Sequence, residues 1–232
     1  MKTAEIVTVE CEFFEMNSYL LHAVGGGAGE ECVVIDAGLP AEAILAEIRR
    51  RGWRPAAILL THGHADHFCG IPEILAKFPG TPVGIGVGDA AMLASARLNL
   101  SATIGIPLEL PPVDRTFSDG ETLSIAGLTF EVRHTPGHTP GHVVYRLCDE
   151  HAMEKTAGAT TKNVSPMHVF VGDVIFRESV GRTDLPGGSA SQLDHSIREK
   201  LYTLPGETVL HSGHGSATTV AHEKRFNSFV TE

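Results

Sequence analysis

Three histidines and one aspartate are crowded into the seven-residue segment THGHADH. The apolar residues 56–60 come directly before it and predict a short buried strand. Because alternate residues of an extended segment point to the same side, His62 and His64 can reach one point in space together. Asp66 and His67 follow where the chain must turn, and we expect them to serve a second point nearby. Imidazole and carboxylate groups suit zinc, iron and manganese, so this segment is a candidate site for two metal ions.

Further metal-seeking side chains occur in three later segments. His138 lies in HTPGHTPGH, where glycines and prolines restrict the loop and leave room beside a metal. Asp173 ends the apolar stretch FVGD, and its carboxylate could bridge two cations. His214 stands between glycines in HSGHG, at the end of another predicted strand. Polar groups at the ends of several strands commonly build the sites of α/β proteins. We therefore expect these groups to meet the first segment at one edge of a sheet.

The remaining histidines have less distinctive surroundings. We predict that three of them support the site or the fold and do not bind metal: His134, His142 and His211. An isolated buried histidine is usually a core residue whose ring is hydrogen-bonded. We expect this role for the last five: His22, His151, His168, His195 and His222.

Apolar patterns predict the strands and helices that must position these groups. Strands are predicted over residues 5–13, 17–24, 31–38, 56–62, 81–86, 121–134 (as a hairpin), 142–148, 167–176 and 208–215. Helices are predicted over residues 41–51, 68–78, 88–98, around 193–201 and over 221–229, and a Pro-rich loop over 99–117. Strand-rich and helix-rich stretches mix throughout both halves, which favours sheets between outer helix layers. We predict a single α/β domain over residues 1–232.

The composition argues against several classes of function. The chain has 232 residues, of which 42% are hydrophobic and 20% are charged, a balance typical of a globular protein with a buried core. A formal net charge of −10 disfavours a nucleic-acid partner. The first residues contain no apolar run typical of a signal peptide, and no stretch approaches transmembrane length. We expect a cytoplasmic protein with no membrane partner.

The four cysteines, Cys11, Cys32, Cys69 and Cys148, form no C-x-x-C pair. Zinc-finger sites need paired cysteines, so this class is excluded. Scattered single cysteines in a chain of this size indicate free and mostly buried thiols in a reducing compartment.

Two segments lack any periodicity. The polar insert at residues 149–166 separates two predicted strands, and we expect it at the end of the sheet opposite the histidines. The Pro-rich residues 104–112 are the better candidate for shaping a substrate pocket. Arg182 and Asp184 are predicted to form a salt bridge near the site, and Arg177 is interpreted in the same way.

The motifs THGHADH, TPGHTPGH, GDVIF, VGRTD and GHG, in this order, resemble those of the metallo-β-lactamase superfamily. The first motif is highly specific for the superfamily. GDVIF followed by VGRTD is typical of its glyoxalase II-like hydrolases, particularly the short, single-domain kind. The similarity extends from NSYLL near the N-terminus to RFNSF near the C-terminus. This resemblance implies a four-layer αβ/βα sandwich with the metals at one edge of the two sheets.

The resemblance also implies a set of ligands, position by position. The first metal would be bound by His62, His64 and His138, and the second by Asp66, His67 and His214, with Asp173 as the bridge. The cofactors would be two divalent metal ions, with zinc as the first choice and iron or manganese as alternatives.

The implied activity is hydrolysis of a small thioester such as S-lactoylglutathione. Two cations about 3.5–4 Å apart can share a water and lower its pKa from about 15.7 towards about 7, which yields a nucleophilic hydroxide. The leaving thiolate needs no strong general acid, and Asp66 is the candidate catalytic residue that orients the nucleophile. The chain departs from its relatives at Ser212, where many have proline. Only 18 residues follow His214, so recognition of glutathione is expected to differ from that of classical glyoxalase II.

Several other functions remain open at this point. A persulfide dioxygenase of the same superfamily would use His62, His138 and Asp173 around one iron, although the GHG motif favours the hydrolase branch. A nuclease is disfavoured by the acidic balance, and a secreted β-lactamase by the absence of a signal peptide. A catalytically silent metal-binding protein is disfavoured by the complete ligand set. We expect a small-molecule thioester as the partner, and a monomer or a homodimer.

Overall fold

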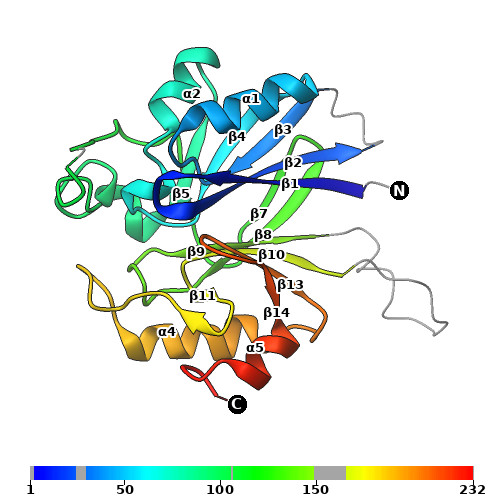
Figure 1. Cartoon of the computed structure of the whole chain (residues 1–232), viewed down its shortest axis with the longest axis vertical. Helices are drawn as coiled ribbons and strands as arrows, with labels where there is room; N and C mark the ends of the chain where they lie inside the picture. The colour runs from blue at the N-terminus through cyan, green and yellow to red at the C-terminus, as the bar shows by residue number, and fades with distance from the viewer. Residues whose placement is uncertain (1–2, 25–29, 106, 149–165, 232) are drawn as a thin grey trace.

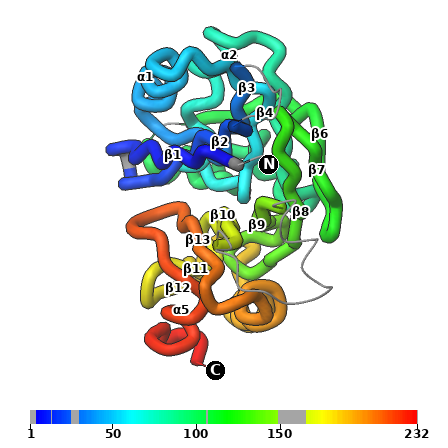
Figure 2. Tube along the Cα trace, turned by 90° about the vertical axis from the view of Figure 1, so that its right-hand side faces the viewer, coloured from blue at the N-terminus to red at the C-terminus, as the bar shows by residue number. Residues whose placement is uncertain are grey.

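The computed structural model describes residues 3–24, 30–105, 107–148 and 166–231. Two six-stranded sheets face each other, and helices cover the outer face of each (Figure 1). The order of layers is therefore helix, sheet, sheet and helix, which confirms the predicted four-layer αβ/βα sandwich. Turned by 90°, β1 to β4 with α1 and α2 still lie above β10, β13 and α5 (Figure 2). The assignment of residues 1–232 to one domain stays a prediction.

The N-terminal sheet is built in chain order. Its strands are β1 (Thr3–Cys11), β2 (Met16–Val24), β3 (Glu31–Ile35), β4 (Arg54–Leu60), β5 (Val83–Gly86) and β6 (Arg115–Phe117). β3 to β6 run parallel, and β1 and β2 are antiparallel to their neighbours. After Glu31, β3 is apolar because both of its faces are buried: Val33 faces the second sheet, whereas Val34 packs under the helices.

Two helices cover the outer face of this sheet. α1 (Ala41–Arg51) buries Ile44, Leu45 and Ile48 along one side, which are the residues whose spacing predicted the helix. α2 (Ile71–Lys77) is shorter than predicted and buries Ile71 and Ile74.

The C-terminal sheet has the strand order β14-β13-β10-β9-β8-β7. Its strands are β7 (Thr122–Ile125), β8 (Leu128–His134), β9 (Val143–Leu147), β10 (His168–Gly172), β13 (Val209–Ser212) and β14 (Thr218–Thr219). The helices α4 (Ala190–Ser196), with a π-helical continuation η5 (Ile197–Leu201), and α5 (Val220–Phe226) cover its outer face. A small hairpin, β11 (Ile175–Phe176) with β12 (Ser179–Val180), follows β10. Three 3-10 turns complete the elements: η1 (Phe13–Glu15), η2 (Ala65–His67) and η3 (Val87–Met92).

Two local predictions in the middle of the chain are wrong. The helix predicted over 88–98 is only the 3-10 turn η3 followed by further turns. The carboxylate of Asp89 accepts hydrogen bonds from the backbone N of Gly63 and of Gly141, so tertiary contacts hold this segment in place. The loop predicted over 99–117 ends in the strand β6. Phe117 is buried between the sheets, and β6 pairs in parallel with β5 at the edge of the sheet.

Four of the five histidines predicted to lie in the core do not lie there. His195 is exposed on α4, and His22, His168 and His222 are only half-buried. Two of these rings have partners near the surface: His22 stacks on Trp53 with ring centroids 4.9 Å apart, and His222 Nε2 lies 2.9 Å from Glu178 Oε1. The pattern around an isolated histidine does not distinguish these positions from core positions. The fifth, His151, lies outside the described residues.

The insert predicted over 149–166 also falls almost entirely outside the described residues. The strands that flank it pair Leu147 with His168. Asp173 follows the other end of β10, so this pair lies at the end of the sheet away from the predicted ligands. Of the cysteines, Cys11, Cys32 and Cys69 are buried and Cys148 is half-buried, and all four are free. No helix in the described ranges combines the length and the hydropathy that a membrane crossing needs.

Candidate metal centre

The seven side chains predicted to bind metal lie together at one edge of the sandwich. Four of them, His62, His64, Asp66 and His67, belong to the loop and 3-10 turn after β4. The other three come from separate places on the second sheet: His138 from the loop between β8 and β9, Asp173 after β10, and His214 after β13. The two sheets are joined here, because the Val143 backbone N donates to the Thr61 carbonyl at 2.9 Å.

Among the described residues their ligand atoms form three overlapping groups: the two clusters that the resemblance implies, and a third made of His62, His67 and Asp173. His62, His64 and His138 make one of the two implied clusters, and Asp66, His67 and His214 make the other, with all ligand atoms of a cluster within 4.8 Å of one another. The carboxylate of Asp173 lies between them. Its Oδ1 is 3.3 Å from His67 Nε2, and its Oδ2 is 3.7 Å from His138 Nε2 and 3.6 Å from His214 Nε2. A carboxylate in this position can bridge two cations.

The hydrogen bonding of these atoms fits cations between them. Nε2 of His62 and His67 and Oδ1 of Asp173 are buried without a hydrogen-bond partner, as is Nε2 of His64. Buried polar atoms without partners are rare because each costs free energy. In addition, His64 Nδ1 and His138 Nε2 converge to 2.8 Å. The histidine and aspartate groups therefore suit a divalent metal site.

The two clusters differ in their electrostatics. Burial, together with the charge of His138, lowers the pKa of His64 to about 3, and burial also lowers the pKa of His62. Both imidazoles are therefore neutral at pH 7, the form that binds a metal. Burial alone would also lower the pKa of His67, but the carboxylates of Asp173 and Asp36 outweigh it and raise that pKa. A cation in the second cluster would displace this proton.

Asp36 is a functional residue that the sequence reasoning missed. It follows β3 with a φ of 55°. Its Oδ2 lies 2.8 Å from His67 Nδ1, and its carboxylate accepts from the backbone N and the Oγ1 of Thr61, each at 2.8 Å. These contacts fix the His67 ring with Nε2 toward the site. The available signal was a carboxylate at the end of the apolar stretch VVID, next to the strand that carries the histidines.

Asp89 is a second buried carboxylate behind the site, and it too was missed. It accepts hydrogen bonds from Gly63 N at 3.0 Å, Gly141 N at 2.6 Å and Thr139 Oγ1 at 2.5 Å. Gly63 lies between the first two histidines, and Thr139 follows His138. Asp89 therefore ties together the loops that carry the first cluster.

The three histidines predicted to play supporting roles lie outside both clusters. His142 is fully buried, its Nδ1 lies 3.2 Å from Thr135 Oγ1, and its Nε2 accepts from the Asp173 backbone N at 3.2 Å. His211 stacks on Phe170, and His134 Nε2 lies 2.8 Å from a backbone carbonyl. His142 thus holds the backbone of the bridging aspartate.

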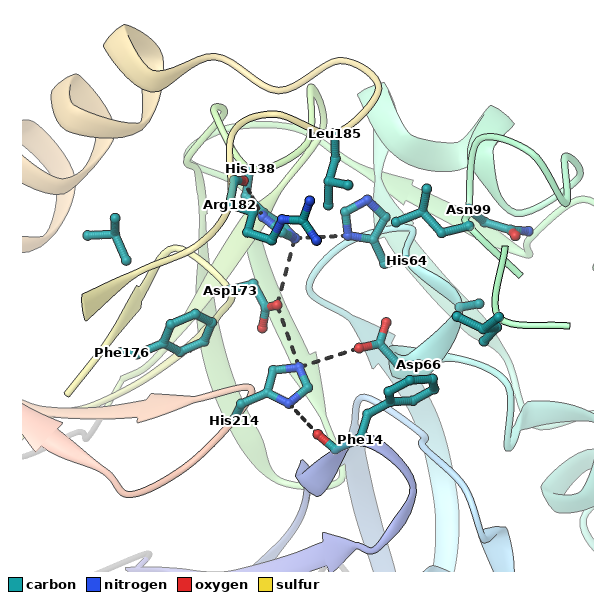
Figure 3. A pocket seen from close by; sticks show the side chains of 14 residues that line it. Phe14, His64, Asp66, Asn99, His138, Asp173, Phe176, Arg182, Leu185 and His214 are labelled. Atoms are coloured by element: carbon teal, nitrogen blue, oxygen red, sulfur yellow. Dashed lines mark hydrogen bonds and ion pairs between the residues drawn. The ribbon is translucent and has the colours of Figure 1, made fainter. Parts of the chain in front are cut away.

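A pocket of about 350 Å³ opens beside the clusters (Figure 3). Phe14 and Phe176 lie on either side of His214, and Leu185 and Asn99 lie near His64. Further apolar lining comes from Ala65, Leu100, Ile104 and Val180.

Outside the metal clusters, the charged residues and the Pro-rich residues 104–112 contribute few side chains to the pocket wall. Arg182 also lines the pocket and is exposed, and it forms a bidentate pair with Asp184 at 2.9 Å, as predicted. Arg177 also pairs with a neighbouring carboxylate, but by one longer contact: its Nε lies 3.9 Å from Glu178 Oε1. Both side chains are exposed, and neither lines the pocket. Of the Pro-rich segment 104–112, Ile104 lines the pocket, whereas Leu108 and Leu110 pack against the core.

Comparison of the sequence with known proteins identifies one matching family profile and several similar proteins. A sequence profile described as "Metallo-beta-lactamase superfamily" matches residues 13–151. A protein of Bacillus subtilis named "Probable metallo-hydrolase YqgX" is 36% identical over 202 residues, which cover 87% of this chain and 88% of that protein. The Haemophilus influenzae protein named "Hydroxyacylglutathione hydrolase GloC" is 34% identical over 203 residues, with the same coverage.

Two solved structures extend the similarity over the whole chain. BLEG-1, described as a B3 metallo-beta-lactamase, superposes with a TM-score of 0.84 at 33% identity, covering 98% of this chain and 100% of its own. TTHA1623, solved in a di-iron-bound form, has a TM-score of 0.77 at 35% identity, with coverage of 97% and 100%.

Proposed function

Because this chain belongs to the metallo-β-lactamase superfamily, we propose that it is a metal-dependent hydrolase of a small thioester. The observation that carries the proposal is the pair of clusters joined by Asp173 at the floor of a pocket. His62, His64 and His138 would hold one cation, and Asp66, His67 and His214 the other. Two divalent cations bound there would supply Lewis acidity to activate water and polarise a carbonyl.

The pocket fits a small substrate better than a highly charged one. Apolar side chains make up much of its wall, and Arg182 is its one lysine or arginine among the described residues. That guanidinium is already paired with Asp184. A thioester with a compact acyl group, such as S-lactoylglutathione, can place its carbonyl at the clusters and extend its thiol portion toward solvent. The name of the Haemophilus influenzae relative supports this choice of substrate.

The side chains of the site support hydrolysis in specific ways. Asp66 is half-buried, lines the pocket, and has Oδ2 3.4 Å from His214 Nε2. It can therefore bind a cation and accept a hydrogen bond from the attacking water, which is the catalytic role we assign to it. A thiolate leaves without protonation by a strong acid. Among the described residues that line the pocket, the carboxyl groups are those of Asp66 and Asp173, both assigned to metal binding, which suits a thioester better than an amide.

The test combines metal analysis with a substrate panel. We expect purified protein to contain about two divalent ions per chain, with zinc as the first choice and iron or manganese as alternatives. We expect turnover of S-lactoylglutathione and related thioesters. Alanine at His62, His64 or Asp173 should remove metal and turnover together. Full turnover without these side chains, or turnover of a β-lactam in place of any thioester, would contradict the proposal.

The second candidate is a mononuclear iron dioxygenase acting on a persulfide. It would use His62, His138 and Asp173 around one iron. Asp66 and His214 lie 3.4 Å apart beside His67, and this complete second cluster favours the hydrolase. Oxygen uptake with a persulfide and one iron per chain would reverse the preference.

A further inference from the structure

Glu223 is a completely buried carboxylate that belongs to neither metal cluster. It lies on α5, and burying its charge is costly unless hydrogen bonds satisfy it. Its Oε1 accepts a short hydrogen bond from Thr218 Oγ1. Its Oε2 accepts from the Glu178 backbone N and from Asn227 Nδ2, both at 2.9 Å. The donors lie in β14, in the turn at Glu178 and directly after α5. The carboxylate therefore joins separate segments of the chain.

The segment joined to α5 is the turn of the β11–β12 hairpin. Glu178 occupies this turn with a φ of 61°, a left-handed conformation that is unfavourable for a residue other than glycine. Ser179 is held as well, because Asn227 Nδ2 donates to its carbonyl at 2.9 Å. His222 Nε2 lies 2.9 Å from Glu178 Oε1. The C-terminal helix thus fixes a turn whose backbone would otherwise relax.

The same hairpin forms part of the metal-binding edge. Phe176 and Val180 line the pocket, and the Phe176 ring meets the His214 ring edge-on, with centroids 6.0 Å apart. Two residues beyond Val180, the Arg182 carbonyl lies 2.8 Å from His138 Nδ1. This contact orients the ring of His138, so that its Nε2 points toward His64 and Asp173.

We propose that Glu223 is a positioning residue of the active site: it fixes the β11–β12 hairpin, and the hairpin fixes His138 and one wall of the pocket. The proposal rests on the proposed function only in treating the clusters as metal sites. A residue with a purely structural role would affect the stability of the fold. A positioning residue also changes the affinity of the cluster that contains His138.

Two substitutions separate charge from hydrogen bonding. In Glu223→Gln, the amide oxygen can accept from Glu178 N and Asn227, and the amide nitrogen can donate to the Thr218 hydroxyl, which is free to rotate. Glu223→Leu has a similar volume but leaves these donors without an acceptor. Leu201→Ala is the matched control, because it removes buried side-chain atoms from the core cluster that also contains Ile175 and contacts Val180, but removes no hydrogen bond to the hairpin turn.

The experiment is a titration of the chelated, metal-free full chain with Zn²⁺ against a chromophoric chelator. We expect Glu223→Leu to weaken one binding event by about 10-fold, the lower end of the effect of losing an outer partner of a metal-binding histidine. The weakened event should be the one that His138→Ala abolishes. Glu223→Gln should bind within about twofold of the unmodified protein, and Leu201→Ala should lower the Tm without changing either affinity. With S-lactoylglutathione as substrate, the fold increase in KM of Glu223→Leu should exceed the fold decrease in its kcat.

The following outcomes would contradict the proposal or separate it from the proposed function. Unchanged affinities in Glu223→Leu, or an equal loss in Leu201→Ala, would overturn it. If Glu223→Leu does not fold, Asn227→Ala removes the bond to the Ser179 carbonyl and should weaken the same event; an unchanged affinity there would also overturn it. If no thioester is hydrolysed by the unmodified protein, the proposed function fails, but the titration still tests the role of Glu223.

Discussion

The two halves of the sandwich supply the metal-binding side chains in different ways. The N-terminal half delivers four of them from one loop, and buried carboxylates behind that loop hold it in place. The C-terminal half delivers one side chain from each of three separated loops. There the backbone itself comes close to the site: a Cβ on Gly213 would lie 2.3 Å from Asp173 Oδ1 and 2.6 Å from His67 Cε1. Both halves have supporting contacts behind their ligands, but only the C-terminal half must also bring separate loops together at a close approach of the backbone.

The largest effect is expected where the two halves meet. Asp173→Ala removes the carboxylate within 3.7 Å of histidines from both halves. Without it, the carboxylate that reaches histidines of both clusters is gone, and a pair of cations in adjacent clusters would repel each other. We expect less than half of the normal metal content and a fall in turnover of about 100-fold or more. Elemental analysis and thioester kinetics on the same preparation check this, and a variant with two bound ions would contradict the bridging role.

A matched pair of glycine substitutions tests the difference in how the halves are packed. Gly213→Ala places a methyl group against the Asp173 carboxylate and the His67 ring, neither of which can move without leaving the site. Gly63→Ala meets Met92 Cβ at 2.8 Å and, at 3.3 Å each, Met92 Sδ and the Asp89 backbone O, none of which is a predicted metal ligand. We expect Gly213→Ala to lose most of its metal.

Gly63→Ala should keep its metal and lose about 1–3 kcal/mol of stability by overpacking. Metal content and denaturant unfolding measure the two effects. Equal metal loss in both variants would remove the distinction between the halves.

The support behind the N-terminal loop can be tested at Asp36. Asp36→Asn keeps the shape of the side chain but removes its charge, and its amide group cannot both accept from Thr61 and hold His67 in the same tautomer. We expect metal affinity to fall by about 10- to 100-fold, as for other outer partners of metal-binding histidines. The loss of affinity should affect the metal-binding event that the substitution His67→Ala abolishes. A titration in which both binding events are unchanged would show that His67 needs no such support.

The contrast between the halves also explains what could be predicted from the sequence. The loop after β4 contains its pattern within seven residues, so its four side chains were identified locally. His138, Asp173 and His214 were placed by the motifs around them and by resemblance, because their convergence depends on the order of strands in a sheet. Asp36 and Asp89 were missed because each acts through contacts 25 or more residues away in the sequence. Glu223 lies in an ordinary helical pattern, and only the fold shows what it holds.

The smallest effect is expected at two tyrosines that join the halves symmetrically. Tyr145, on the second sheet, donates to the Leu60 carbonyl at 2.7 Å, directly before the histidine loop. Tyr19, on the first sheet, donates to the Ser212 carbonyl at 2.6 Å, two residues before His214. Each half thus holds the strand end of the other. Removing either hydroxyl leaves a buried carbonyl with one bond fewer, which costs about 0.5–1.5 kcal/mol.

Ser212 has a second donor, because Asn17 Nδ2 also bonds to its carbonyl at 3.1 Å. Tyr19→Phe should therefore cost no more than Tyr145→Phe, and neither should change metal content. Urea unfolding of the two variants, measured with metal bound and after chelation, gives the comparison directly. A Tyr19→Phe variant that loses metal would mean that the C-terminal loops depend on this hydroxyl for their convergence, and that the two halves differ less than their sequences indicate.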